Sequence, residues 1–273
     1  MKQKSSKKLL STSLLLVLIA LVSLTAATTA WMTIADSTRL KTMRLDVTSG
    51  ANLRFDLDSH ETFEEYVKSL RLIDIADRIL RDQGYHPREN PLSPVTTTDC
   101  IHFTLENGEP AATESYMEFV LHFMATDDMV VHLTTAGEEG TRIFSDEVSD
   151  IAKAMRISFT ADDSTAVYDP GMEPGSEEGL GGKIFGLARG NRIVYDASNT
   201  LFFLNAGVDK PVTVRIWLEG TDEICTDALR GVPYHIQLRF VGTDENGNLL
   251  EDSRTITRRS AAATPTEERN ENK

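Results

Sequence analysis

Residues 212–219 read VTVRIWLE, and this stretch decides the fold class. Its apolar side chains stand at every second position, at Val212, Val214, Ile216 and Leu218. Successive side chains of a β-strand point to opposite faces of a sheet. The stretch therefore predicts a strand with one apolar face and one mainly polar face.

The same alternation recurs at residues 101–105, 117–123, 155–159 and 236–240. Strands with a single apolar face are typical of antiparallel sheets that expose one side to water. Such sheets cover their apolar faces by packing against each other. We therefore expect a mainly β protein: an antiparallel β-sandwich, with residues 31–257 as one domain.

Turn residues support this interpretation. Asp127-Asp128 separates strands expected at 116–126 and 129–134, and Asn246-Gly247 separates strands expected at 234–242 and 249–257. Asn-Gly readily adopts the positive φ angles of a tight hairpin turn. Two earlier strands are expected at 42–48 and 51–57.

One amphipathic helix interrupts the strands. Apolar residues spaced by three or four predict a helix over 61–82, and the helical insertion as a whole spans 61–83. The residues with this spacing are Phe63, Tyr66, Val67, Leu70, Ile73, Ala76 and Leu80. Asp58 with Glu61 resembles a capping box, and Gly84 ends the run. Shorter helical turns are expected at 145–153 and 223–229, and an acidic Gly/Pro loop at 169–182.

The N-terminus resembles an export signal. Lys2, Lys4, Lys7 and Lys8 precede a run from Leu9 to Trp31 that contains no charged residue. Residues 1–30 are therefore a signal peptide cleaved by a signal peptidase or, alternatively, a retained membrane anchor helix. Both predict that the rest of the chain is extracellular or at the cell surface, and that only this segment meets the membrane. Residues 258–273 read as a disordered tail.

The net charge of −14 excludes one class of partner. An acidic body repels phosphate backbones, so we expect no nucleic-acid binding.

Two cysteines, Cys100 and Cys225, fall in the exported part of the chain. An oxidising compartment permits a disulfide between them, which would stabilise the fold by roughly 4–5 kcal/mol. Two free, buried thiols are the alternative. Two cysteines without a Cys/His pattern do not make a zinc site.

No catalytic motif is present. His60-Glu61-Thr62-Phe63-Glu64 has Glu where a zincin helix needs its second His. The expected strands carry four histidines, His102, His122, His132 and His235. These would hold a metal only if the strand order brought three of them together, so we expect no metal site, cofactor or enzymatic activity. Trp217 stands on the polar face of its strand, where a large apolar side chain is unexpected. It is either a candidate contact surface for a partner or a residue that another element covers.

The junction Thr29-Ala30-Trp31-Met32-Thr33, followed by Met43 and Val47, resembles the start of TasA/camelysin-type exported proteins of Gram-positive bacteria, which depend on a dedicated signal peptidase. The body also resembles uncharacterised exported proteins of these bacteria at 92–99, 115–123 and 212–229. The resemblance implies a jelly-roll-like sandwich at the cell surface and fibres formed by lending an N-terminal strand, here 31–47, to the next subunit. The camelysin side of the family has been described as metalloprotease-like.

These observations favour a non-enzymatic secreted or cell-surface protein that acts by self-association or matrix contact, as in a fibre subunit. An extracellular ligand- or carbohydrate-binding module using Trp217 is the first alternative. A divergent camelysin-like metalloprotease is the second.

Overall fold

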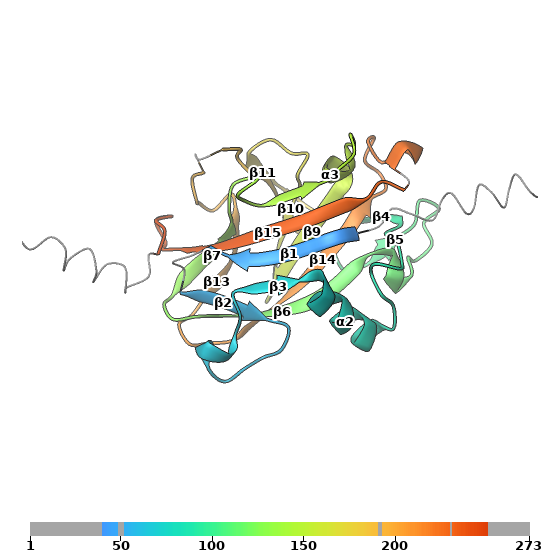
Figure 1. The fold of residues 1–273 in the computed structure, drawn as a ribbon. Helices are drawn as coiled ribbons and strands as arrows, with labels where there is room; N and C mark the ends of the chain where they lie inside the picture. Colours follow the sequence, from blue (N-terminus) through green and yellow to red (C-terminus); the bar gives the residue numbers. More distant parts are fainter. Residues whose placement is uncertain (1–39, 49–51, 191–192, 230, 251–273) are drawn as a thin grey trace, which may run out of the picture.

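The computed structural model describes residues 40–48, 52–190, 193–229 and 231–250, which form a mainly β protein with two mixed sheets (Figure 1). The expected signal or anchor segment 1–30 and the expected tail 258–273 lie outside the described residues. Among the helices of the described ranges, none has both the length and the apolar character needed to cross a membrane.

The first sheet contains six strands: β1 (Leu40–Val47), β3 (Ser69–Arg71), β7 (Met129–Leu133), β8 (Arg142–Phe144), β13 (Thr200–Leu204) and β15 (Tyr234–Thr243). Their order is β13-β7-β15-β1-β3, and β8 also pairs with β15. In Figure 1, β1 (blue) lies beside β15 (red). β1 is parallel to β15 and antiparallel to β3, so it is hydrogen-bonded on both sides.

The second sheet contains nine strands: β2 (Leu53–Asp56), β4 (Pro94–Thr97), β5 (Phe103–Thr104), β6 (Met117–Ala125), β9 (Met155–Ala161), β10 (Ser164–Tyr168), β11 (Gly175–Gly179), β12 (Gly182–Gly186) and β14 (Lys210–Glu219). Their main order is β11-β12-β10-β9-β14-β4-β5. β6 pairs with β14 and β2. The stretch quoted above is thus a central strand, β14, between β9 and β6.

The apolar faces of the two sheets meet in one core. Phe240 on β15 is fully buried, and its ring lies 5.2 to 5.9 Å from three rings of the second sheet, those of Phe55, Phe123 and Phe159. Apolar residues of both sheets belong to the same buried cluster. The alternation in 117–123, 155–159, 212–218 and 236–240 therefore correctly predicted strands and their buried face.

The prediction of purely antiparallel sheets is wrong. β1–β15, β10–β12 and β14–β4 are parallel pairs. A period of two places side chains on faces but carries no information on the direction of the neighbouring strand, and each of these pairs joins segments that no tight hairpin connects.

The predicted helix at 61–82 is also partly wrong. The α-helix, α2, spans Leu72–Gln83, and the preceding residues form a 3-10 turn, η1 (Phe63–Glu65), and then β3. Leu70 reaches the core from β3, where pairing with β1 satisfies the backbone. Gly84 ends the helix as expected, with φ 81°.

The buried stripe of α2 differs from the predicted one. Leu72, Ile75, Ala76 and Ile79 are buried, whereas Ile73 and Leu80 are 48% and 46% exposed. Apolar residues at 3–4 spacing occur on two faces of this helix, so the spacing does not say which of them packs on the sheets.

The remaining helical elements are short: η2 (Thr113–Ser115), α3 (Ile151–Ala154) and η3 (Asp227–Leu229). η3 falls inside the helical turn expected at 223–229, whereas α3 overlaps only the end of the turn expected at 145–153 and extends one residue beyond it. The acidic Gly/Pro stretch 169–182 is not only a loop, because residues 175–179 form the edge strand β11.

The strand expected over 101–105 is shorter than predicted. Only Phe103–Thr104 forms β5, and Ile101 is 55% exposed. Cys100 has a φ of 57°, and the Asp99 carboxylate accepts hydrogen bonds from the backbone N–H groups of residues 101 and 102. This turn interrupts the alternation.

Candidate functional site

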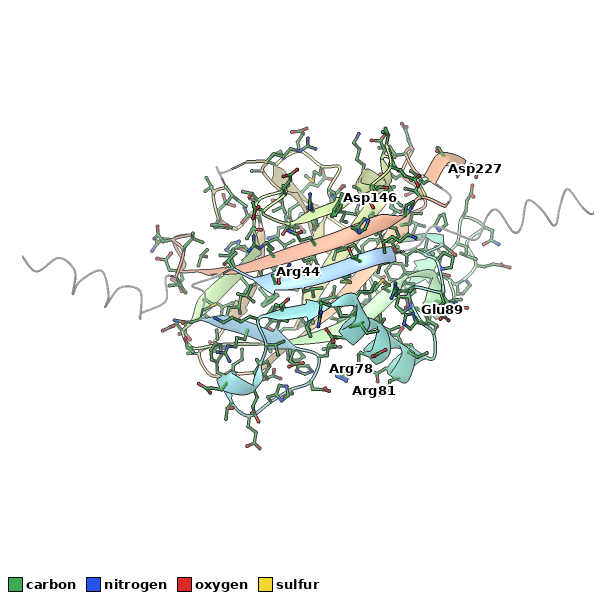
Figure 2. The ribbon with its side chains drawn as sticks, viewed as in Figure 1. Arg44, Arg78, Arg81, Glu89, Asp146 and Asp227 are labelled. Carbon is green, nitrogen blue, oxygen red and sulfur yellow. The ribbon has the colours of Figure 1, made fainter. Side chains whose placement is uncertain are left out.

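The four histidines expected on strands do not converge, and His102 lies just before β5 and not on a strand. His102 lies 2.7 Å from Asp99, His122 lies 2.9 Å from Asp209, and His235 lies 3.0 Å from Asp146, which Figure 2 labels. Each of the three thus has its own carboxylate partner. Across the described ranges, no three His, Cys, Asp or Glu side chains lie close enough together to hold a metal ion.

His132 is buried inside the first sheet. Its Nδ1 lies 2.8 Å from Asn199 Oδ1, and its Nε2 lies 3.1 Å from Thr243 Oγ1. Burial lowers the pKa of His132, and the hydrogen bonds to Asn199 only partly oppose this. The imidazole is therefore a neutral, structural hydrogen-bonding group that links β7 to β15 and to the residue before β13.

Both cysteines are free thiols in the structure. Cys100 is fully buried, whereas Cys225 is partly buried against the main core. Burial raises the pKa of the Cys100 thiol to about 11, so the thiol stays protonated at neutral pH and is a poor nucleophile.

Of the two possibilities left open for Trp217, a contact surface or a residue covered by another element, the structure shows the second. Its side chain is fully buried, and its Nε1 donates a 2.9 Å hydrogen bond to Glu219. The segment containing β4 and β5 covers this end of β14, where Trp217 packs with Val95, Cys100, Phe103 and Val167 in a second small core. The outer face of the second sheet is thus apolar and covered at one end.

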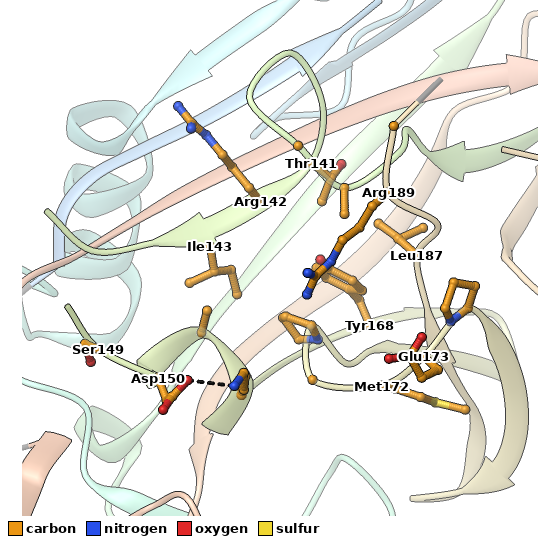
Figure 3. A pocket seen from close by; sticks show the side chains of 18 residues that line it. Thr141, Arg142, Ile143, Ser149, Asp150, Tyr168, Met172, Glu173, Leu187 and Arg189 are labelled. Carbon is orange, nitrogen blue, oxygen red and sulfur yellow. Dashed lines mark ion pairs between the residues drawn. The ribbon is translucent and has the colours of Figure 1, made fainter. Parts of the chain in front are cut away.

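A cavity of about 630 Å³ opens beside β8 and α3 (Figure 3). Its other walls are the end of β10, the loop at 169–174 and the segment at 187–190. Apolar wall residues include Ile143, Pro170, Met172 and Leu187. This is the volume of a small-molecule site.

Some of the charges in and around the cavity are paired. Lys153 lies 2.7 Å from Asp150, the ion pair drawn in Figure 3. Arg156 lies 3.0 Å from Asp169 and 2.8 Å from Asp222, which ties the 169–174 loop to β9.

Tyr168, Glu173 and Arg189 have no such partner, and Arg142, whose guanidinium lies over the Phe144 ring, also forms no ion pair within the described residues. Within the described part of the chain, the Tyr168 hydroxyl makes no hydrogen bond, and the side chains of Glu173 and Arg189 form no hydrogen bond or ion pair. Tyr168 is only 2% exposed, and burial raises the pKa of its hydroxyl. In Figure 3 Arg189 lies next to Tyr168, and its positive charge acts on that hydroxyl.

The edge of the first sheet at β13 has a different character. Its sequence, TLFFL, contains no charge, and in the described sheet it pairs only with β7. Phe202 points into the core and contacts Phe123, whereas Phe203 is 39% exposed. The edge strand β11 of the second sheet differs from β13, because it carries two acidic residues, Glu177 and Glu178.

Sequence reasoning did not identify Tyr168, Arg189 or β13 as functional candidates. Residues 200–204 form a short apolar run, and the Asn and Gly that flank it are a recognisable strand signal. Nothing local marks Tyr168 or Arg189, because the cavity is assembled from segments distant in sequence.

Comparison of the whole chain with family models, with curated proteins and with solved structures finds no match.

Proposed function

We propose that this chain is a non-enzymatic exported protein, secreted or held at the cell surface, that acts by self-association or by contact with an extracellular matrix. The basic and apolar N-terminus supports export as a signal peptide or anchor helix. The two packed sheets support a β-sandwich, and its jelly-roll-like character is part of this proposal.

The edge strand β13 is the observation that carries the proposal. An edge strand presents unpaired N–H and C=O groups that another strand can join, and proteins usually block this with charges, prolines or bulges. β13 has a register irregularity near its start, but the stretch from Phe202 to Leu204 pairs regularly with β7 and bears no charge. Phe203 adds an exposed ring beside this edge.

Charge favours a second copy at this edge. Two molecules that each carry a net charge of −14 repel one another wherever their acidic surfaces approach. At β13 the strand is uncharged, and the neighbouring Lys210 is neutralised by Asp162 at 2.6 Å. Antiparallel addition of β13 to β13 would extend the first sheet across two copies through strands that themselves carry no charge.

The edge of β13 is more accessible than the donor segment that the resemblance implies. Residues 31–39 of that segment lie outside the described residues, and residues 40–47 form β1. Lending β1 to another subunit would first break its hydrogen-bond ladders with β15 and β3. It would also expose the four buried core residues of β1, which are Leu40, Met43, Leu45 and Val47. Pairing through the edge strand β13 does not require removing a strand from its sheet.

Sedimentation of the full-length protein over a concentration series tests the proposal. We expect reversible association that Phe203→Lys weakens at least about tenfold, which corresponds to about 1.4 kcal/mol. Ile101→Lys, at a side chain that is 55% exposed on another surface, should leave association unchanged. A protein that stays monomeric throughout, or two variants that associate equally, would refute self-association through β13.

Cell fractionation tests the location independently. Replacing Leu14, Leu16 and Leu18 by Asp in the apolar run should retain the protein in the cytoplasm, whereas the native chain should leave it. A native chain found only in the cytoplasm would contradict export.

The ligand-binding alternative does not rest on Trp217, because that side chain is buried. Its support is the cavity beside β8. The metalloprotease alternative needs three ligands around one ion, and the described histidines lie apart on separate carboxylates.

A further inference from the structure

We infer that the cavity beside β8 and α3 binds a small organic carboxylate with an apolar body, held by Arg189 and Tyr168. This inference does not depend on the proposed self-association, because the cavity and β13 use different residues.

The first argument is the Tyr168 hydroxyl. The Tyr168 side chain is nearly covered as a whole, but its hydroxyl is not among the fully buried polar atoms without a partner in the described residues, so it is accessible from the cavity. Tyr168 is 2% exposed and lines the cavity, and none of the described residues partners its hydroxyl. Burial keeps this phenol protonated by raising its pKa, so the hydroxyl is available as a donor.

The second argument is Arg189. Arg78, Arg156 and Arg215 each pair with a carboxylate of the protein itself. Arg189 has no such partner within the described ranges, although its guanidinium lies in the cavity next to Tyr168 (Figure 3). A planar guanidinium binds a carboxylate through two parallel hydrogen bonds, and a phenolic O–H adds a third.

The third argument is the balance of charge in the cavity. The lining carries three cations, Arg142, Lys153 and Arg189, against two carboxylates, Asp150 and Glu173, and Asp150 is paired with Lys153. The acidic character of the whole chain therefore does not extend to the position in front of Arg189.

The walls indicate the rest of the ligand. Side chains of Ile143, Leu187 and Met172 offer an apolar surface, and about 630 Å³ accommodates a molecule of roughly the size of an aromatic acid or amino acid. Glu173, also unpaired, lies on another part of the lining in Figure 3. A ligand that also carries an ammonium group would find its counter-charge there.

Titration calorimetry with the full-length protein tests the inference, with 3-phenylpropionate and phenylalanine as probes. Both share the carboxylate and the ring, and 3-phenylpropanamide is the neutral control of the same shape. We expect at least one of the acids to bind at least tenfold more tightly than the amide. Tighter binding of phenylalanine would identify Glu173 as the ammonium partner, and Glu173→Gln should then remove the preference.

Two variants separate binding from folding. Arg189→Met should weaken carboxylate binding at least tenfold, whereas Arg88→Met, at an exposed arginine outside the cavity, should not change it. Tyr168→Phe should weaken binding several-fold without lowering the melting temperature of the free protein, since no hydrogen bond among the described residues is lost. Absence of binding by both acids at millimolar concentration, equal affinity for acid and amide, or an Arg189→Met variant that binds like the native protein would overturn the inference.

Discussion

Phe240 connects the two sheets, and its replacement by Ala is the most direct test of how they pack. The side chain is fully buried. Its ring meets Phe55, Phe123 and Phe159 at interplanar angles of 68°, 74° and 89°, all in edge-to-face geometry. Phe240→Ala therefore removes a ring contributed by one sheet from among three rings contributed by the other.

The magnitude follows from two contributions. Truncation of a buried Phe to Ala typically costs about 3–5 kcal/mol through lost burial and the cavity left behind. Edge-to-face ring pairs contribute about 0.5–1.5 kcal/mol beyond burial, so three such contacts place Phe240 near the upper end of that range. We expect Phe240→Ala to lower the free energy of unfolding by about 5 kcal/mol.

Urea unfolding of the full-length protein, followed by circular dichroism, measures this value. Phe203→Ala is the matched control, because the same side chain is 39% exposed at the sheet edge and its loss should cost about 1 kcal/mol or less. The slope of the free energy against urea should be the same in both variants. A Phe240→Ala variant that loses less than about 1.5 kcal/mol, or no more than Phe203→Ala, would refute the packing of the sheets through this ring cluster.

Two further predictions concern polar groups. Burial lowers the pKa of His132 in the folded protein. Below about pH 6.5 the unfolded chain therefore binds a proton at this side chain more readily than the folded chain does. The free energy of unfolding should fall as the pH drops below about 6.5, and His132 should contribute up to about 1.4 kcal/mol to this loss at pH 5.5. Urea unfolding at pH 7.5 and 5.5 checks this, and a His132→Gln variant with an unchanged pH dependence would contradict it. Arg156→Met should cost about 1–3 kcal/mol and speed proteolytic cleavage at the loops of Asp169 and Asp222, because both partly buried carboxylates lose their partner. Arg156→Lys should restore part of the loss, and cleavage rates equal to those of the native protein would contradict the role of this ion pair.

The alternating segments were predictable because the signal and its cause are both local. In β6, β9, β14 and β15 the side-chain period of a strand coincides with burial on one face. Strands such as β10, β12 and β13 were missed because they are short and lack a full alternation.

The candidate sites were far less predictable. Trp217 occupies the position that the pattern assigned to it, on the outer face of β14, but a segment about a hundred residues earlier in the chain buries it. Arg189 and Tyr168 lie on different segments with ordinary local sequences, and they share a cavity because of how the two sheets and the intervening loops are arranged.

The sequence alone was enough to predict a β-rich protein whose strands bury alternate side chains, and a helix that ends at Gly84. Both features depend on residues only a few positions apart in the chain. Strand direction, the true start of α2, the burial of Trp217 and the composition of the cavity came from the three-dimensional arrangement. These features depend on contacts between segments that are distant in the sequence. Such contacts produce no periodic pattern in either segment, so the sequence of each segment does not predict them.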